Sequence, residues 1–489
     1  MIHLEEKLMG PLCKAASALA LASALGLSGC SGGGAQSSAA PPVLSSMLFA
    51  ADDGVHGIEL WKSDGTGAGT ALVKDINTTA TLHSFPGGSG TPLPTEFAFL
   101  NGTWFFSADD GVSGVELWKS DGTERGTVQV KDININPNSS ASSSPRGVTV
   151  FNNALYFSAD DGGSGRELWR TDGTEGGTVQ VKDIAPGSGF IGGIQVPLSS
   201  SPSGFTVFNN ALYFAADDGV HGVELWKTDG TGTGTVLVKD INPGTGASSS
   251  PRGFTVFNNA LYFAADDGVH GVELWKTDGT GTGTVLVKDI NPTAGSSPSG
   301  FTVFNNALYF SADDGVFGVE LWKTDVAGST VLVKDINPTA DSTPSGFKVF
   351  NNALYFSASD GAAGAELWKT DGTGSTVRLG AVSLVSGLTV FNNGLYFSAS
   401  DGVAGIELWK SDGTPGGTVQ VKDINSTSPG ASSSPMAFTV LNNALLFSAD
   451  DGVTGRELWR TDGSGSTVQV KDICPGNCAG VPVVVPLSP

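Results

Sequence analysis

The chain has 489 residues, of which 15% are charged and 69 are glycine. Acidic residues outnumber basic residues by 48 to 26, which gives a formal net charge of -22. We therefore expect no nucleic-acid partner, because phosphate binding needs a basic surface that releases counterions.

The first thirty residues differ in composition from the rest of the chain. Lys14 is followed by an apolar run at 15–27 and then by Ser-Gly-Cys ending at Cys30. Such a run is typical of a secretory signal and is too short to span a membrane. The sequence LSGC at its end resembles a bacterial lipobox, in which the cysteine is acylated and becomes the mature N-terminus. The resemblance implies a lipoprotein signal peptide at 1–29 and a lipid on Cys30.

Two alternatives concern this leader. Glu5 and Glu6 lie where a leader is usually basic, which indicates that translation could begin at Met9 instead of Met1. A plain secretory signal with an incidental cysteine is the second alternative. Residues 30–44 are rich in Gly, Ser and Ala and are predicted to be a flexible linker. We expect an exported protein whose lipid anchors it to the bacterial envelope, at the outer membrane or the cell surface.

From residue 45 to residue 489 the chain is predicted to be one repeat domain. The string ELW, followed two residues later by Asp, occurs nine times, at spacings from 41 residues (Trp368 to Trp409) to 57 residues (Trp61 to Trp118). Periods near fifty residues indicate a repeat architecture. Two copies of the unit, 205–243 and 254–292, are identical over 39 positions, which indicates recent duplication of a whole module.

Within the unit at 205–243 we predict four short strands. The first two, FTVF and ALYFAA, are joined by Asn209 and Asn210, which tolerate the positive φ of a two-residue hairpin turn. The third, GVELWKT, and the fourth, TVLVKDI, are joined by an Asp-Gly turn. Segments rich in Pro, Gly and Ser link one unit to the next.

Both faces of these strands are apolar. In the third strand Val223 and Leu225 fall on one face and Trp226 on the other, so each sheet must pack between two neighbours. The pattern predicts an all-β fold, a single β-propeller of about nine four-stranded antiparallel blades. An open β-solenoid is the alternative, but it would expose apolar ends.

The two ends of the repeat domain predict how the ring closes. Unit 1 begins at SMLFAADDG and lacks a first strand, which the segment VPVVV at 481–485 could supply. The N- and C-terminal segments would then pair in one blade and leave no sheet edge exposed.

The repeats also carry a family resemblance. The segment YFAADDGVHGVELWKTDGTGTGTVLVKDI resembles the bacterial ELWxxDGT repeat family, and the similarity covers about residues 45 to 475. Unit 6 departs from the pattern with TDVAG and unit 7 with VRLGAV. The resemblance implies an exported repeat protein without a settled activity. The blade order is also similar to kelch propellers, which are chiefly binding scaffolds.

Two of the four cysteines remain after the leader is removed. Cys13 lies in the leader and Cys30 would carry the lipid, which leaves Cys474 and Cys478 in CPGNC. In the oxidising compartment of an exported protein these two are predicted to form one small disulfide. A metal site would need two more ligands, and none lies nearby in the sequence.

An acidic loop recurs in every unit, with the sequence DDG or SDG. Its second Asp is first of all a turn residue, because the side chain can cap backbone N–H groups. Calcium is the alternative, since clustered oxygen ligands beside a glycine could hold it, although the spacing is not that of a D-x-D-x-D-G loop. We expect no other cofactor. The candidate calcium ligands are Asp53, Asp110, Asp161, Asp218, Asp267, Asp314, Asp360, Asp401 and Asp451.

The ELWxxD segment carries two further acidic residues in each unit. Its Glu lies on the same strand face as the Trp two residues later, beside the Lys of VKDI, which predicts a Glu–Lys pair in each blade. In unit 7, Glu366 has Gly380 in place of this Lys, and Arg378 could substitute for it. The Asp, such as Asp229, is predicted to turn the chain between the third and fourth strands.

One loop position varies between units. Histidine occupies it in three units, and a catalytic or metal-binding histidine should not be so interchangeable. No Ser-His-Asp set or phosphate-binding glycine loop is found in the sequence. The position holds His56, Ser113, Ser164, His221, His270, Phe317, Ala363, Ala404 and Thr454.

These observations predict a function in binding. The variable position and the long loops at 77–96 and 187–200 fall on one face of the predicted disc, which indicates that this face meets a partner. We expect a monomeric, lipid-anchored, non-catalytic module that binds an extracellular protein or glycan in surface adhesion or scaffolding. The alternatives are a carbohydrate-active propeller hydrolase or lyase, with carboxylates of the acidic loops as acid and base, and a purely structural envelope component.

Overall fold

The computed structural model describes residues 45–78, 84–85, 97–136, 141–362 and 364–476. The expected signal peptide, the lipidated Cys30, the linker to residue 44, Cys478 and the closing segment 481–485 lie outside the described residues. The described residues fall in one compact unit, Val43–Pro489. Their regular secondary structure is β-strand, apart from one short 3-10 turn, η1 (Pro415–Gly417), and turns and loops connect the strands. None of the described helices is long and apolar enough to cross a membrane.

The four strands predicted for the unit at 205–243 are confirmed. They form an antiparallel sheet in chain order: β14 (Ser203–Phe208), β15 (Ala211–Asp217), β16 (Val223–Thr228) and β17 (Val236–Lys239). The turn between β14 and β15 consists of Asn209 (φ 45°) and Asn210 (φ 59°), the left-handed pair that matches the twist of a hairpin.

Five further four-stranded sheets of the described chain have the same order. They are β4 (Ala98–Leu100), β5 (Thr103–Asp109), β6 (Val115–Ser120), β7 (Val128–Lys131); β8 (Arg146–Phe151), β9 (Ala154–Asp160), β10 (Arg166–Thr171), β11 (Val179–Lys182); β18 (Arg252–Phe257), β19 (Ala260–Asp266), β20 (Val272–Thr277), β21 (Val285–Lys288); β22 (Ser299–Phe304), β23 (Ala307–Asp313), β24 (Val319–Asp325), β25 (Thr330–Lys334); and β33 (Met436–Leu441), β34 (Ala444–Asp450), β35 (Arg456–Thr461), β36 (Thr467–Lys471). The described part of unit 1 has three strands, β1 (Met47–Asp52), β2 (Ile58–Ser63) and β3 (Ala71–Lys74).

Units 7 and 8 share one seven-stranded sheet. The linker between them contains no proline, so the fourth strand of unit 7 continues into the first strand of unit 8 as the 16-residue β29. Register shifts at Ser383, Ser386 and Thr389 bend this strand from one unit to the next. The sheet consists of β26 (Ser345–Phe350), β27 (Ala353–Ser359), β28 (Ala365–Thr370), β29 (Thr376–Phe391), β30 (Gly394–Ser400), β31 (Ile406–Ser411) and β32 (Val419–Lys422).

The segment 187–200, which the sequence indicated only as a long loop, contains a hairpin. Strands β12 (Ser188–Ile191) and β13 (Ile194–Pro197) pair around Gly192 and Gly193, which both have positive φ. Two glycines between short apolar runs are a hairpin signal, and here it determines the local structure.

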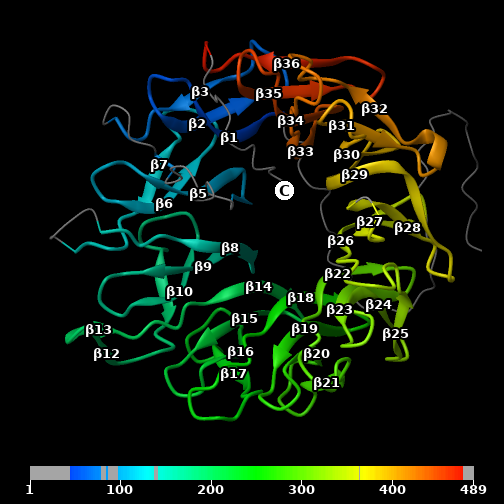
Figure 1. Cartoon of the computed structure of the whole chain (residues 1–489). Helices are drawn as coiled ribbons and strands as arrows, with labels where there is room; N and C mark the ends of the chain where they lie inside the picture. Colours follow the sequence, from blue (N-terminus) through cyan, green and yellow to red (C-terminus); the bar gives the residue numbers. More distant parts are fainter. Residues whose placement is uncertain (1–44, 79–83, 86–96, 137–140, 363, 477–489) are drawn as a thin grey trace, which may run out of the picture. The chain divides into compact units, whose positions relative to one another are not determined.

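Each sheet packs on both faces, as the strand pattern predicted. On one face Leu212 and Phe214 of β15 share a core with Tyr156 of the preceding sheet. On the other face Tyr213 and Leu225 pack against the following sheet, and all of these side chains are buried. The first strands β8, β14, β18, β22, β26, β29 and β33 are neighbours in that order, on the inner side of their sheets (Figure 1).

The last sheet also contacts the first. Leu446 of β34 lies in one hydrophobic core with Phe49 of β1 and Leu60 of β2. Lys471 donates a hydrogen bond from Nζ to the carbonyl oxygen of Thr70 at 2.8 Å. Sheets at opposite ends of the repeat domain therefore meet through an apolar core and a polar contact.

Candidate functional site

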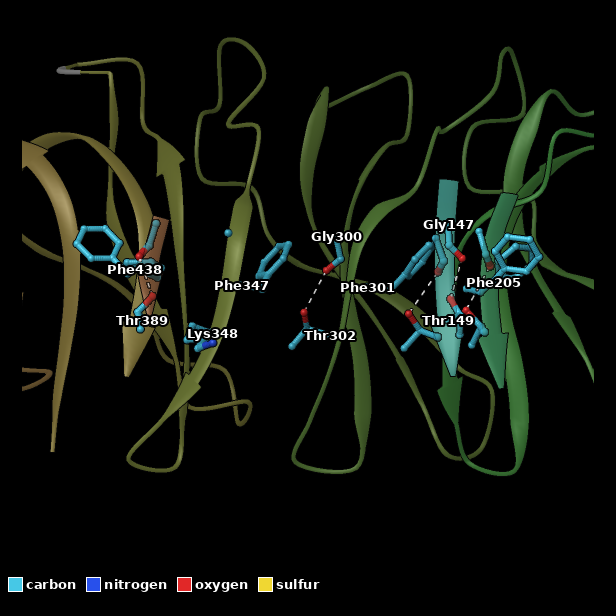
Figure 2. Close-up of a pocket in the computed structure, with 18 of the residues that line it drawn as sticks. Gly147, Thr149, Phe205, Gly300, Phe301, Thr302, Phe347, Lys348, Thr389 and Phe438 are labelled. Carbon is cyan, nitrogen blue, oxygen red and sulfur yellow. Dashed lines mark hydrogen bonds between the residues drawn. The ribbon is translucent and has the colours of Figure 1, made fainter. Parts of the chain in front are cut away.

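The seven first strands surround a cavity of about 1030 Å³, which we call the inner cavity (Figure 2). Each strand contributes a short segment to the wall, with the sequence Gly-Phe-Thr in three of them and a variant of it in the other four. The wall segments are 147–149, 204–206, 253–255, 300–302, 346–348, 387–389 and 437–438.

In five of the seven wall segments the glycine makes room for the aromatic ring of the next sheet. Gly300 has a φ of 71°, and a Cβ at this position would lie 2.8 Å from the ring of Phe347. Gly147 has the same relation to Phe205, at 2.7 Å. The rings therefore lie edge-on against neighbouring backbone, and glycine is the residue that fits there.

In the five wall segments that contain a threonine, its hydroxyl is bonded to its own strand. Thr302 donates its hydroxyl hydrogen to the carbonyl oxygen of Gly300 at 3.3 Å, a bond drawn in Figure 2. Thr149 and Thr389 make the same contact. The hydroxyl oxygens keep lone pairs that can accept hydrogen bonds from a ligand in the cavity.

The wall departs from Gly-Phe-Thr at four positions: Val148 and Leu388 replace phenylalanine, Ala437 replaces glycine and Lys348 replaces threonine. Lys348 occupies the position of the threonine, and Leu388 replaces the phenylalanine that would cover Gly346. A Cβ on Gly346 would meet nothing within 4 Å. Lys348 is the only charged side chain in the described wall.

The acidic loops are turns held by their second Asp. In unit 4 the Oδ1 of Asp218 accepts hydrogen bonds from the backbone N–H groups of Val220 (2.9 Å) and His221 (2.8 Å). Its Oδ2 lies 2.8 Å from Nδ1 of His221. This side-chain bond raises the pKa of His221. Burial acts to raise the pKa of Asp218, but the hydrogen bonds from His221 and Val220 hold it below its usual value.

The same carboxylate takes a different donor in other units. Ser113 Oγ donates to Asp110 at 3.0 Å, and Thr454 Oγ1 donates to Asp451 at 3.1 Å. His, Ser and Thr can replace one another at this position because each places a donor against the Asp. Phe317 in unit 6 has no such group, and its loop keeps the two backbone bonds.

The nine candidate calcium ligands lie in separate loops. In each of them Oδ1 accepts a hydrogen bond from the backbone N–H two residues later. Within the residues that the structure describes, no three His, Cys, Asp or Glu side chains are grouped so as to hold a metal ion. Calcium binding stays a prediction. A calcium ion bound to one of these Asp side chains would need further ligands from outside its loop.

The predicted pairing of the ELW glutamates with lysine is wrong. Oε2 of Glu224 accepts hydrogen bonds from Ile241 N (2.8 Å) and Ser249 Oγ (2.6 Å), and Oε1 accepts one from Ser249 N (2.8 Å). Lys239 instead donates to the carbonyl oxygen of Thr284 in the next sheet, at 3.0 Å. The linker to the next sheet folds back over the glutamate, and the sequence pattern of the strands does not show that path.

Burial perturbs these glutamates. Glu59 and Glu116 are fully buried, and burial raises the pKa of each to about 7, although the hydrogen bonds from Ser84 and Ser143 oppose the shift. Burial also raises the pKa of Glu224. These groups are closed off from solvent and are part of the sheet-to-linker packing.

Unit 7 is the exception that its sequence indicated. Its Glu366 is bonded to Arg378, whose Nη1 lies 3.0 Å from Oε1 and 3.1 Å from Oε2. The side-chain bond to Glu366 raises the pKa of Arg378. An arginine on β29 thus takes the place of the linker donors, because no linker loop separates units 7 and 8.

Two further predictions concern turns and cysteines. Asp229 turns the chain as expected, since its Oδ1 accepts hydrogen bonds at 2.8 Å from both N and Oγ1 of Thr231. Cys474 is buried and disulfide-bonded, while its predicted partner Cys478 lies outside the described residues.

The chain matches no protein-family model and no curated protein. Solved structures with a similar strand arrangement include a puromycin hydrolase, 13% identical with a TM-score of 0.37, where the match covers 74% of this chain and 58% of that one. A mutant of puromycin hydrolase complexed with PGG is 13% identical with a TM-score of 0.37, and the match covers 78% of this chain and 61% of that one. A prolyl endopeptidase structure is 13% identical with a TM-score of 0.38, and the match covers 66% of this chain and 49% of that one. This chain thus spans about half to three fifths of the length of these proteins.

These comparisons contradict the prediction of a non-catalytic surface module. All three named structures are of hydrolases or endopeptidases, so the prediction of a non-enzyme in adhesion or scaffolding is withdrawn. At this identity and TM-score the likeness concerns the arrangement of strands, and it assigns no residue and no reaction to this chain.

The sequence reasoning also missed the wall residues. It required functional residues to break the repeat and found such breaks only in loops. Lys348 and Leu388 break the repeat within first strands, where GFKVF and GLTVF replace GFTVF. Alignment of the nine units at this strand would have revealed both changes.

Proposed function

We propose that the protein is a hydrolase that binds an extended peptide in the inner cavity. The observation that carries this proposal is the wall itself. Strands β8, β14, β18, β22, β26 and β33 each stand at the end of the strand order in their sheets. The edge of such a strand that has no partner strand in its own sheet offers backbone N–H and C=O groups, with which an extended peptide can form hydrogen bonds.

The wall favours a peptide over an oligosaccharide. Sugar rings stack on open aromatic faces, whereas the wall phenylalanines are engaged with their neighbours. The ring of Phe301 lies 5.6 Å from that of Phe310 and presses edge-on against Gly253. What the wall offers instead is a series of ring edges, threonine oxygens and strand edges at regular intervals, which suits alternating side chains and amides.

As acid–base groups for this reaction we propose the histidines of three acidic loops, in place of the expectation from the sequence that a histidine at this variable position is not catalytic; these histidines are not part of the cavity wall. In units 1, 4 and 5 an imidazole is held through Nδ1 by an Asp, which leaves Nε2 to take a proton from water as the water attacks the peptide carbonyl. The C–N bond then breaks and the amine leaves with a proton. Units with Ser or Thr keep the same turn, so the fold does not need these histidines. At the end of β15, Asp217 N donates to the carbonyl oxygen of Ser200 at 2.9 Å, three residues before β14 begins.

The test is cleavage of a quenched fluorescent peptide library by the full chain, with products identified by mass spectrometry. In the triple variant His56→Ser, His221→Ser, His270→Ser the rate is expected to fall by about 100-fold or more, because general-base catalysis contributes that much. Peptide affinity, measured by fluorescence polarisation, should be unchanged. The matched control is Ser113→Ala, which alters the same loop position in a unit without histidine and should cleave at the wild-type rate.

Each outcome of this experiment tests one of three parts of the proposal: hydrolysis, the acid–base groups and the binding of peptides. Binding without cleavage by the wild-type chain would overturn the hydrolytic half. Cleavage that persists in the triple variant would overturn the assignment of acid–base groups. Absence of peptide binding, or binding of oligosaccharides alone, would overturn the assignment of the cavity to peptides.

We further propose that the chain is exported and anchored through a lipid on Cys30. The support is the leader sequence and its LSGC motif. Expressed in a bacterium with labelled palmitate, the wild-type chain should carry the label and sediment with membranes. The variant Cys30→Ala should lose both properties, and a labelled Cys30→Ala chain would contradict the proposal.

We also propose that the sheets form a closed propeller of nine blades built from ELWxxDGT repeats, with residues 481–485 completing the first blade. The contact of Lys471 with Thr70 supports this closure. The measurement that tests it is the cost of breaking this contact, compared with that of the equivalent contact between two sheets in the middle of the chain.

A further inference from the structure

The inner cavity has one charged position, Lys348, and it lies on β26 beside Phe347 (Figure 2). We propose that Lys348 is a specificity-determining residue that binds a carboxylate of the peptide in the cavity. This inference rests on the proposed function and adds the substrate class to it: peptides that present a carboxylate, either at the C-terminus or on an acidic side chain.

The cavity has space for such a group next to the lysine. In five other wall segments the glycine is covered by the phenylalanine of the next sheet; a Cβ on Gly253, for example, would lie 2.9 Å from the ring of Phe301. Gly346 is uncovered, because the next sheet presents Leu388 instead. The lost ring and the added ammonium group lie at the same pair of strands. Together they form an open pocket with a cation at its side, and the other departures of the described wall, Val148 and Ala437, are uncharged.

Lys348 is available for a ligand. Lysines of the fourth strands are engaged by the next sheet; Lys334, for example, donates to the carbonyl oxygen of Thr376 at 3.1 Å. The backbone of Lys348 pairs with that of Tyr355 in the sheet, but its ammonium group has no hydrogen-bond or ion-pair partner among the described residues, and the residue is half-buried. The remaining wall side chains are uncharged, so no neighbouring carboxylate in the described wall competes for it. In a chain with a net charge of -22, a cation facing the cavity selects the sign of the ligand.

The test uses four fluorescent peptides of one apolar sequence: with a free C-terminus, with a C-terminal amide, and amides with an internal Glu or Gln. Their affinities are measured by fluorescence polarisation on the full chain and on Lys348→Thr, which introduces the residue found at this position in Thr302 and Thr389. We expect the carboxylate peptides to bind about five- to tenfold more weakly to this variant, the effect of losing one partly buried ion pair. The amide and the Gln peptide should be unaffected. The control Lys276→Thr removes the same charge from β20, outside the cavity.

The two arms separate the sources of the carboxylate. A loss confined to the free C-terminus assigns the pocket to the chain end, and a loss confined to the Glu peptide assigns it to a side chain. If all four peptides bind and Lys348→Thr changes none of the affinities, the inference is overturned while the proposed function stands. If none of the four binds to the wild-type chain, both fail. An equal loss in Lys276→Thr would show a general charge effect and would also overturn the inference.

Discussion

The residues with the strongest electrostatic perturbation are the ELW glutamates. Each lies buried on the third strand of its sheet, covered by the linker that follows in most units and by Arg378 of β29 in unit 7. In most units it accepts hydrogen bonds from that linker instead of an ion pair, as Glu224 does from Ser249. Hydrogen bonds offset part of the desolvation cost, but a carboxylate in this position still favours its protonated form. The pKa of Glu59 and of Glu116 is accordingly about 7, against an ordinary value of 4.5.

This shift predicts a stability that falls as pH rises. Between pH 4.5 and about 7 the folded state holds protons on Glu59 and Glu116 that the unfolded state has lost, so the free energy of unfolding decreases with pH across this window. The His–Asp pairs act in the same direction. Hydrogen bonding to Asp218 raises the pKa of His221, so the stabilisation by the protonated imidazole is lost as the pH rises through this raised pKa. We expect the Tm to be lower at pH 8 than at pH 5 by about 3–6 °C.

The contribution of the glutamates can be separated from that of the histidines. In the double variant Glu59→Gln, Glu116→Gln two of the titrating groups are removed, so the decline of Tm between pH 5 and pH 8 should become shallower. The triple histidine-to-serine variant serves as the comparison for the remaining part. A Tm that rises with pH in the wild-type chain would contradict the assigned direction of the pKa shifts.

At the scale of single elements, the sequence predicted the strands and turns that depend only on residues close together in the chain. The strands of unit 4 and the Asn209–Asn210 turn follow from alternation and from side chains that tolerate positive φ. The 16-residue β29 was not predicted, because continuity between two units depends on the absence of a linker, not on a strand signal. The hairpin of β12 and β13 was missed because its strands are only four residues long.

The candidate site was less predictable than the strands. The acidic loops were identified as turns from their Asp-Gly sequence, and their geometry agrees. The partner of the ELW glutamate was mistaken, because Ser249 lies 25 residues after Glu224 and reaches it only through the path of the linker. The inner cavity could not be recognised from one unit, since its wall gathers three residues from each of several strands that lie about fifty residues apart.

At the scale of the whole molecule, each sheet packs between two neighbours, so the first and the last sheet would each lack one neighbour in an open array. An open array would expose the apolar face of β34 and β35 at one end and that of β1 and β2 at the other. In the structure these faces meet in one core, and Lys471, the last residue of β36, contacts the first sheet as the lysines of other fourth strands contact the next sheet. A closed ring would make the last interface equivalent to all the others.

This equivalence can be measured by breaking one contact at two places. Lys471 donates to Thr70 O at 2.8 Å between the last and first sheets, and Lys239 donates to Thr284 O at 3.0 Å between two sheets in the middle of the chain. In a closed ring Lys471→Ala and Lys239→Ala each lose one partly buried hydrogen bond, so both should lower the free energy of unfolding by a similar amount, about 1 kcal/mol. In an open array the sheets at the ends would already be apart, and Lys471→Ala would unfold as the wild-type chain does. Urea unfolding followed by tryptophan fluorescence distinguishes the two, because the reporter Trp61 lies 5.7 Å from Nζ of Lys471. A cost for Lys239→Ala without a cost for Lys471→Ala would show that the ring is open in solution.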